Sequence, residues 1–271
     1  MAFTNKTVII TGASSGIGKS LATELAKRGA NLILAARHYV TLCEMTEELI
    51  KQYNIKAVAV QCDVTNQEDC AVMVNQAMRT FGKIDVLINN AGISMRALFN
   101  DADVKVLKSV MDVNFWGTVY CTKYALPHIL KSKGSIVGVS SIAGFKGLPG
   151  RTGYSASKFA MNGFLDALRI ENLKNDIHIL TACPGFTTSN IRNNSLTASG
   201  EQQGESSMDE EKMMTSEEVA IIIADGIESR ARVIVMTRQG KLMVFLSKFF
   251  PGFVDKQIYK TFVKEKKSLL K

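Results

Sequence analysis

A tyrosine and a lysine four positions apart could work together in proton transfer. Tyr154 and Lys158 stand in the segment GYSASKFAMNGFLDALR (153–169), which continues in an apolar helical rhythm after the lysine. Residues four apart share one face of a helix, so the ammonium would lie beside the phenol. A free phenol titrates near ~10, and a neighbouring cation brings its pKa toward neutral pH. Such pairs also occur on solvated helix faces, so the spacing alone leaves both interpretations open.

A glycine-rich turn near the N-terminus favours the catalytic interpretation. In TVIITGASSGIGKS, Gly12, Gly16 and Gly18 separate a strand predicted over 7–11 from a helix predicted over 18–30. Glycines let the backbone turn tightly and approach a pyrophosphate, and the helix N-terminus offers N–H groups to the anion. A merely tight turn is the alternative, but the preceding strand and the following helix favour a dinucleotide site.

The end of the next predicted strand bears on which dinucleotide is bound. An NAD site usually has an Asp or Glu there, which binds the ribose 2′-hydroxyl. Here the strand 31–36 ends in Ala36, and Arg37 follows it. Without a carboxylate, and with a guanidinium that can bind a 2′-phosphate, the site favours NADP(H) over NAD(H). The alternative is that Arg37 is an ordinary solvated loop residue.

The elements that must position these residues alternate between short β-branched runs and longer helical patterns. Because the runs are continuously apolar, they are typical of parallel strands buried on both faces. Their order predicts an α/β protein: a single-domain Rossmann fold over 1–271, with a doubly wound parallel sheet of about seven strands and helices on both faces. The predicted strands cover 7–11, 31–36, 56–64, 84–92, 134–141, 177–185 and 231–237. Two segments break the alternation: the polar stretch 193–214, expected to be a substrate lid or flexible loop, and a C-terminal extension over 238–271.

Composition and charge exclude several classes of protein. The chain of 271 residues has 33 basic and 25 acidic residues, a net charge of +8, but the basic residues form no stripe with aromatics. We therefore expect no nucleic-acid partner. The five cysteines form no C-x-x-C pair, so we expect reduced thiols and a cytoplasmic protein; no metal site is expected. No apolar run approaches the ~20 residues of a spanning helix, and the N-terminus lacks a signal-peptide pattern.

Six short motifs occur in the order typical of one known family. They are TGASSGIG (11–18), CDV (62–64), NNAG (89–92), VSS (139–141), YSASK (154–158) and PG (184–185). Over about residues 5 to 190 the chain resembles the short-chain dehydrogenase/reductase family, and its C-terminal extension is similar to those of the steroid- and lipid-type members. The resemblance implies a nicotinamide cofactor and the interconversion of a carbonyl and an alcohol.

The resemblance also implies four catalytic roles. Tyr154 would be the acid/base, and Lys158 would lower its pKa and bind the nicotinamide ribose. Ser141 would bind the substrate oxygen; Ser140 is the second candidate, but its side chain would face the other side of the strand end. Asn114 would kink its helix and hold a water in a proton relay. Hydride transfer to a carbonyl builds negative charge on the oxygen, which these donors would stabilise.

Further positions match the family's cofactor contacts. Asp63 and Val64 would contact the adenine, residues 90–92 would shape the pocket beside it, and Thr187 would meet the carboxamide. Ser189 stands where a threonine is usual. Asp63 could equally be a turn residue at a helix N-terminus. The complete predicted cofactor-binding set is Gly12, Ser14, Ser15, Gly16, Ile17, Gly18, Arg37, Asp63, Val64, Asn90, Ala91, Gly92, Tyr154, Lys158, Pro184, Gly185, Thr187 and Ser189.

Together these features predict an NADP(H)-dependent enzyme that interconverts a ketone or aldehyde and an alcohol. Segments 93–98, 143–151 and 186–214 would form the substrate site, and their mostly apolar residues suit an apolar small molecule. The alternative enzyme is a reductase of 3-oxoacyl chains on acyl carrier protein, an acidic partner that basic residues at the rim could dock. Those residues are Arg96, Lys146 and Arg151. An alternative of another class is a nucleotide-binding protein without catalysis, although no catalytic residue is missing.

The C-terminal extension also bears on partners. KLMVFLSKFFPGFV (241–254) gathers aromatic and aliphatic residues near lysines, which suits a dimer contact or the surface of an anionic membrane. A helix that only covers the core, followed by a solvated tail, is the alternative. The resemblance implies a homodimer or homotetramer, with the helix around 116–130 as the contact.

Overall fold

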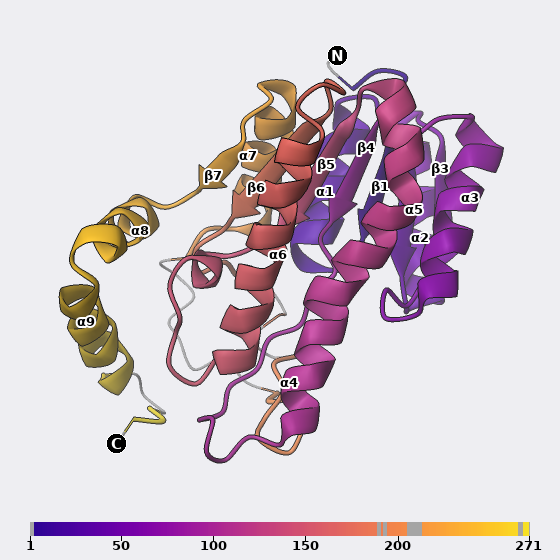
Figure 1. The fold of residues 1–271 in the computed structure, drawn as a ribbon. Coiled ribbons are helices and arrows are strands. Elements are labelled where there is room, and N and C mark those ends of the chain that lie inside the picture. The colour runs from indigo at the N-terminus through magenta and orange to yellow at the C-terminus, as the bar shows by residue number, and fades with distance from the viewer. Residues whose placement is uncertain (1–2, 189–190, 192–193, 205–212, 265–267, 271) are drawn as a thin grey trace.

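The computed structural model describes residues 3–188, 191, 194–204, 213–264 and 268–270. Within them, seven strands form one parallel sheet in the order β3-β2-β1-β4-β5-β6-β7 (Figure 1). The strands are β1 (Thr7–Thr11), β2 (Asn31–Ala36), β3 (Ala57–Gln61), β4 (Val86–Asn89), β5 (Ser135–Val139), β6 (His178–Cys183) and β7 (Val233–Val235). The order reverses between β1 and β4, so the predicted Rossmann-type, doubly wound parallel sheet is confirmed.

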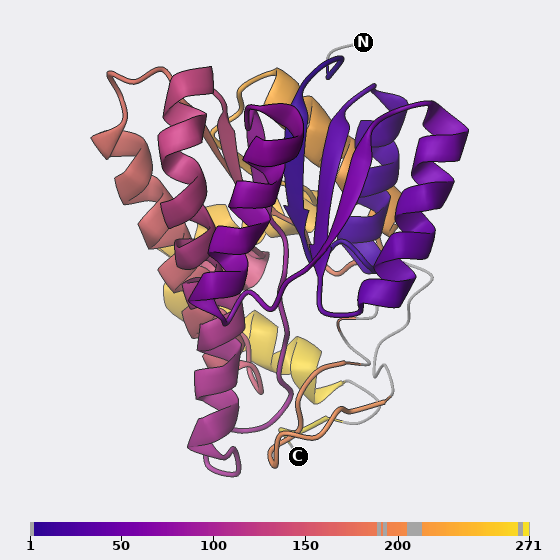
Figure 2. The ribbon, with the colours of Figure 1, turned by 90° about the vertical axis from the view of Figure 1, so that its right-hand side faces the viewer.

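Helices cover both faces of the sheet (Figures 1 and 2). One face is packed by α1 (Gly16–Lys27), α2 (Tyr39–Tyr53) and α7 (Ser216–Glu228). The other is packed by α3 (Gln67–Phe81), α5 (Gly117–Ser132) and α6 (Thr152–Glu171). Strands β1, β5 and β6 are buried at every position, as expected of apolar strands between two helix layers.

Several strands end earlier than the sequence predicts. β4 ends at Asn89, although the apolar run predicts a strand to residue 92. The reason is local: Asn90 donates its backbone N–H to the Thr11 hydroxyl at 3.0 Å and its side-chain amide to the Thr11 carbonyl at 2.8 Å. The chain therefore leaves the ladder at the carboxyl edge, where open α/β sheets form their ligand sites.

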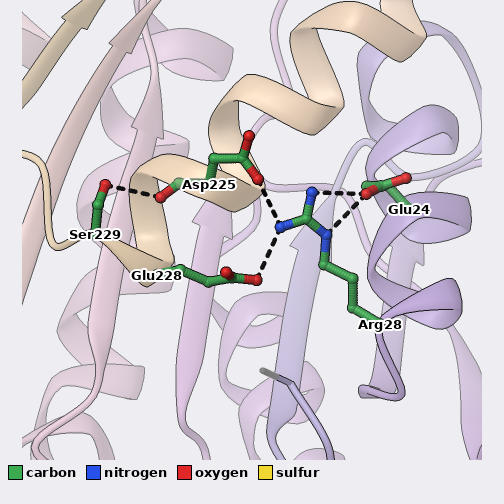
Figure 3. A network of polar contacts seen from close by, with 5 residues as sticks. All are labelled: Glu24, Arg28, Asp225, Glu228 and Ser229. Atoms are coloured by element: carbon green, nitrogen blue, oxygen red, sulfur yellow. Dashed lines mark hydrogen bonds and ion pairs between the residues drawn. The ribbon is translucent and has the colours of Figure 1, made fainter. Parts of the chain in front are cut away.

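An ion-pair network around Arg28 joins α1 to α7 (Figure 3). The guanidinium pairs with Glu24 of α1 at 2.7 Å, and with Asp225 and Glu228 of α7 at 2.7 and 2.8 Å. The Arg28 side chain is only 19% exposed, so water screens these contacts less than it screens a surface pair. The network holds α7 against the helix that begins at the glycine-rich turn.

The described part of the segment 193–214 lies against the loop that follows β4. Leu196 donates its N–H to the Ser94 carbonyl at 2.9 Å, and its carbonyl accepts the Arg96 N–H at 2.8 Å. Met214 makes a short parallel bridge with Thr187. Residues 193 and 205–212 lie outside the described residues, and the role of the segment as a lid stays a prediction.

Two helices beyond β7 form the C-terminal extension: α8 (Arg238–Phe249) and α9 (Pro251–Val263). They lie on the side of the carboxyl ends of the strands (Figure 1). α9 buries Val254 and Ile258, whereas Phe253 and Tyr259 are 56% and 54% exposed. The extension therefore covers part of the protein with one face and presents aromatic side chains on the other. Among the described residues, no helix combines the length and apolar character needed to cross a membrane.

Candidate active site

Helix α6 places Tyr154 and Lys158 side by side under the carboxyl edge of the sheet. Both side chains are buried, at 8% and 3% exposure. Lys158 Nζ lies 5.8 Å from the centroid of the Tyr154 ring and donates a hydrogen bond to the Val139 carbonyl at 2.9 Å. A surface pair would be solvated, so the burial argues against that interpretation.

Two adjacent serines follow β5, and the structure separates their roles. Ser141 forms a side-chain hydrogen bond with Tyr154, and its Oγ also accepts the Ala143 N–H at 3.1 Å. Ser140 turns to the other side, where its Oγ donates to Asn162 Oδ1 at 2.6 Å. The side chains of a strand end alternate between its two faces, so only Ser141 reaches the phenol.

Burial dominates the acid–base properties of the pair. Burial raises the pKa of Tyr154 above its usual value, although the hydrogen bond with Ser141 and the nearby charge of Arg151 oppose the shift. Burial also lowers the pKa of Lys158 to about 8. In the protein alone, therefore, the pKa of Tyr154 is not lowered toward neutral pH, and the Lys158 ammonium is bonded to the Val139 carbonyl.

Asn114 lies in a π-helical turn, Asp112–Trp116, between α4 (Val104–Met111) and α5. Its Oδ1 accepts the Ile93 N–H at 2.9 Å, and its Nδ2 donates to the Ile93 carbonyl at 2.9 Å and to Ser157 Oγ at 2.9 Å. Ser157 donates in turn to the Tyr154 carbonyl at 2.7 Å. The widened turn and the fully buried amide thus connect the loop after β4 to α6.

The glycine-rich turn has the shape of a phosphate cradle. Gly12 and Gly16 have φ of 64° and 51°, the left-handed region that favours glycine. A Cβ on Gly18 would overlap the Gly12 carbonyl and lie 2.6 Å from Asn90 Nδ2. α1 begins at Gly16 with no side-chain cap from Ser15, so its first N–H groups remain for an anion. Ser14 belongs to the same turn and Ile17 to the first turn of α1, and the residues present fit a dinucleotide pyrophosphate.

The other predicted cofactor residues gather along the same edge. Arg37 directly follows β2 and is exposed. It lies next to the phosphate turn, since Ala13 of that turn donates its N–H to the Ala35 carbonyl of β2 at 3.1 Å. Ala91 donates its N–H to the Thr11 hydroxyl at 3.0 Å. A Cβ on Gly92 would lie 3.2 Å from Asn114 Oδ1 and 3.6 Å from Lys158 Nζ, so this glycine borders the reaction centre.

The remaining positions are mixed. Asp63 Oδ1 accepts the Thr65 N–H at 3.0 Å and the Thr65 hydroxyl at 2.8 Å, so the turn-residue alternative describes its side chain in this structure. Val64 is buried against Gly117. Pro184 and Gly185 follow β6, and the buried Thr187 donates its hydroxyl to the Gly185 carbonyl at 3.2 Å. Ser189 lies outside the described residues.

Two residues that the sequence did not single out organise the site. Thr11 orders the loop after β4, and Ser157 joins Asn114 to α6. Both stand inside the motifs TGASSGIG and YSASK, so their positions were a signal. Arg151, predicted only as a basic residue at the rim, also acts on Tyr154 through its charge.

Comparisons with known sequences agree with this geometry. Residues 6–199 match the family described as short chain dehydrogenase. The chain is 40% identical over 231 residues to 11-beta-hydroxysteroid dehydrogenase A of Sesamum indicum, which covers 85% of this chain and 64% of that relative. It is 43% identical over 190 residues to 11-beta-hydroxysteroid dehydrogenase-like 2 of Arabidopsis thaliana, which covers 69% and 61%. The chain thus spans about three fifths of the length of these curated relatives.

A solved structure has the same fold. It is the X-ray structure of an alcohol dehydrogenase from the archaeon Thermococcus sibiricus complexed with 5-hydroxy-NADP, with a TM-score of 0.75 and 22% identity. The match covers 85% of this chain and 95% of that chain, and it concerns the fold alone. The family match spans well over half of the chain, from β1 to the segment beyond β6, and confirms the resemblance in the motifs. The chain therefore belongs to the short-chain dehydrogenase family.

Proposed function

We propose that the protein is an NADP(H)-dependent oxidoreductase that interconverts a ketone or aldehyde and an alcohol. One observation carries the proposal: Tyr154 and Lys158 are buried together, beside the half-buried Ser141, at the carboxyl edge whose neighbouring turn fits a pyrophosphate. Membership of the short-chain dehydrogenase family supports it. The nicotinamide cofactor would supply a hydride to the carbonyl carbon.

The chain's own residues would hold the cofactor along the carboxyl edge. The phosphate turn 12–18 would bind the pyrophosphate, and Arg37 a ribose 2′-phosphate. The segments 63–64 and 90–92 would line the adenine side, and the residues after β6 the nicotinamide side. Lys158 is the ammonium at the centre of this edge and would bind the nicotinamide ribose.

Proton transfer would fall to Tyr154, assisted by its two polar neighbours. Ser141 would donate a hydrogen bond to the carbonyl oxygen as negative charge develops there, and Tyr154 would deliver the proton to the same oxygen. Lys158 would stabilise the phenolate that remains, because its Nζ lies 5.8 Å from the ring centroid, although burial holds the pKa of Tyr154 above its usual value in the protein alone. The Asn114 side chain is already bonded to Ile93 and Ser157, so a water in the relay would have to use another group.

The surroundings of the phenol are apolar. Tyr154 packs in a buried cluster with Met95, Ala97, Val106 and Ala143. An apolar environment of this kind would favour a hydrophobic ketone oriented by few polar groups. The names of the relatives, 11-beta-hydroxysteroid dehydrogenases, point to a bulky polycyclic compound as the first substrate to test.

The acyl carrier alternative is less well supported. Of the basic residues proposed to dock the carrier, Lys146 is paired with Asp255 of α9 at 2.5 Å and is only 16% exposed. A docking site needs its charges accessible to the acidic partner. Non-catalytic nucleotide binding is disfavoured because the four catalytic residues are all present in bonded positions.

Association with other molecules is a further part of the proposal. A homodimer or homotetramer would use α5 and the turn before it, where Trp116 is 44% exposed and stacks on Tyr120 of α5 with 5.9 Å between the ring centroids. The exposed aromatic face of α8 and α9 would lie on an anionic membrane surface. Its exposed side chains are Leu242, Phe245, Phe249, Phe250 and Phe253. Sedimentation velocity tests the first statement, and flotation with phosphatidylserine vesicles, with and without residues 241–271, tests the second.

The function is tested by NADPH oxidation with a panel of aliphatic, aromatic, steroid and acyl-thioester ketones. Tyr154→Phe is expected to reduce turnover by about a thousandfold while NADPH affinity stays near that of the parent, because only the proton donor is lost. Tyr259→Phe, at an exposed phenol on α9, is the matched control. Normal turnover by Tyr154→Phe would refute the acid/base assignment, and turnover of the acyl thioester alone would favour the carrier-linked reductase.

A further inference from the structure

The C-terminal extension touches the loop that joins the two groups proposed to act on the substrate oxygen. This loop, residues 142–151, runs from Ser141 at the end of β5 to the first turn of α6, which carries Tyr154. It therefore fixes how far apart the serine and the phenol lie. It also belongs to the segments expected to line the substrate.

Three contacts follow the loop in order. At its start, Ile142 Cδ1 lies so close to Gly240 of α8 that a Cβ there would overlap it. In its middle, Lys146 Nζ pairs with Asp255 Oδ1 of α9 at 2.5 Å. Near its end, a Cβ on Gly150 would lie 2.7 Å from Leu269 Cδ1. The extension thus touches the loop at its start, in its middle and near its end.

The contacts are tight ones. α9 turns Val254 and Ile258 inward, at 4% and 9% exposure, on either side of Asp255 along the helix. An open pocket between the loop and the extension is lined by Arg96, Pro149, Arg151, Phe262, Leu269 and Leu270. Side chains in direct contact, such as those of the three contacts above, transmit a shift of the extension to the loop.

We propose that the C-terminal extension helps to select substrates by size. It holds the loop 142–151 in place as a wall of the substrate site. The contacts that hold the loop are Ile142–Gly240, Lys146–Asp255 and Gly150–Leu269. The inference rests on the proposed carbonyl reduction at Tyr154. Lys146 and Asp255 are positioning residues in this scheme, since they act through the loop and not on the substrate. A large ketone reaches the wall, whereas a small ketone held at Ser141 and Tyr154 does not.

The Lys146–Asp255 ion pair offers the sharpest test, because each partner can be changed and the pair can be reversed. We would compare Lys146→Glu, Asp255→Lys and the double variant K146E/D255K, with Lys256→Glu on the exposed side of α9 as the control. Each single variant brings like charges together, and the double variant restores an attraction. The probes are a tetracyclic steroid ketone and cyclohexanone, each with NADPH.

For the single variants we expect kcat/KM for the steroid ketone to fall about threefold to tenfold, mainly because KM rises. A change of this size corresponds to the loss of one partly shielded ion pair. Values for cyclohexanone and the NADPH dissociation constant should stay within about twofold, and the double variant should recover most of the loss. Equal losses for both ketones, or a double variant no better than either single one, would overturn the proposal. A loss with Lys146→Glu alone would mean that Lys146 meets the substrate directly.

Hydrogen exchange of the free protein separates this proposal from the proposed function. In the single variants the amides of 142–151 should exchange faster than in the parent and return toward the parent rate in the double variant. Unchanged exchange rates would show that the extension does not hold the loop 142–151, even if the enzyme is active. If none of the ketones in the panel supports NADPH oxidation by the parent protein, the proposed function fails. The exchange result still decides whether the extension holds the loop.

Discussion

Asn114 pairs with both backbone polar groups of Ile93: its Oδ1 accepts the N–H and its Nδ2 donates to the carbonyl, each at 2.9 Å. A side-chain amide thus replaces the strand partner that the chain gives up when it leaves β4. The same Nδ2 reaches Ser157 of the catalytic helix. The position of the loop after β4 and the position of α6 therefore depend on one buried residue.

Replacing this amide should destabilise the protein as well as impair catalysis. Asn114→Ala leaves the Ile93 N–H and carbonyl without their partner, and we expect the free energy of unfolding to fall by about 2 kcal/mol or more. Urea unfolding measures this effect. Asn175→Ala, at an exposed asparagine, is the control and should be near neutral. Parent-like stability of Asn114→Ala would show that the loop does not depend on the side chain.

Lys158 should reduce stability at neutral pH. Its pKa is about 8 when folded, against 10.5 for the free side chain, because burial disfavours the charge. Between pH 8 and 10.5 the unfolded chain binds more protons than the folded protein, so the free energy of unfolding rises with pH over this range. The destabilisation caused by burying Lys158 is therefore greatest below pH 8. Lys158→Met should therefore be more stable than the parent at pH 7, by up to about 3 kcal/mol, while losing activity.

The pH dependence distinguishes this effect from a simple gain in packing. Urea unfolding of the parent and Lys158→Met at pH 7, 8, 9 and 10 should show the advantage of the variant shrinking above pH 8. Lys51→Met, at an exposed lysine of α2, should show no such trend. An advantage that stays constant with pH would contradict a burial cost on the ammonium.

Arg37 should determine the preference for NADPH over NADH. Arg37→Ala removes the guanidinium proposed to bind the 2′-phosphate, so NADPH affinity should fall about tenfold to a hundredfold with little change for NADH. Fluorescence titration with both nucleotides measures the two constants, and Arg79→Ala at the exposed end of α3 is the control. Equal affinity of the parent for NADH and NADPH would refute the argument.

The Arg28 network should contribute to stability but not to catalysis. Arg28→Met removes the ion pairs with Glu24, Asp225 and Glu228, which join α1 to α7. Because the two partners on α7 are partly exposed, we expect a loss of about 1 kcal/mol and a fall in Tm of about 2 to 4 °C. Lys19→Met, at an exposed position of α1, is the control for thermal unfolding. A large change in kcat without a change in Tm would contradict the assignment.

The sequence was sufficient for the fold class, and it predicted a set of site residues, several of which the structure brings together at the carboxyl edge of the sheet. Continuous apolar runs such as 7–11 and 135–139 predict buried parallel strands because two helix layers require apolar residues on both strand faces. Glycines at positions 12 and 16 predict the phosphate turn because other residues rarely adopt the backbone found there. These are local properties, written in residue types and their spacing.

The tertiary structure decided which alternatives hold where the residues themselves are ambiguous. Ser141 rather than Ser140 meets Tyr154 because of the direction in which the strand end faces α6. Burial raises the pKa of Tyr154 above its usual value, although Lys158 lies nearby. The contact of Asp255 with Lys146, more than a hundred positions apart, has no signature in the sequence. Such outcomes depend on which distant segments pack against one another and on how much water they exclude from the site. Only the folded chain determines both.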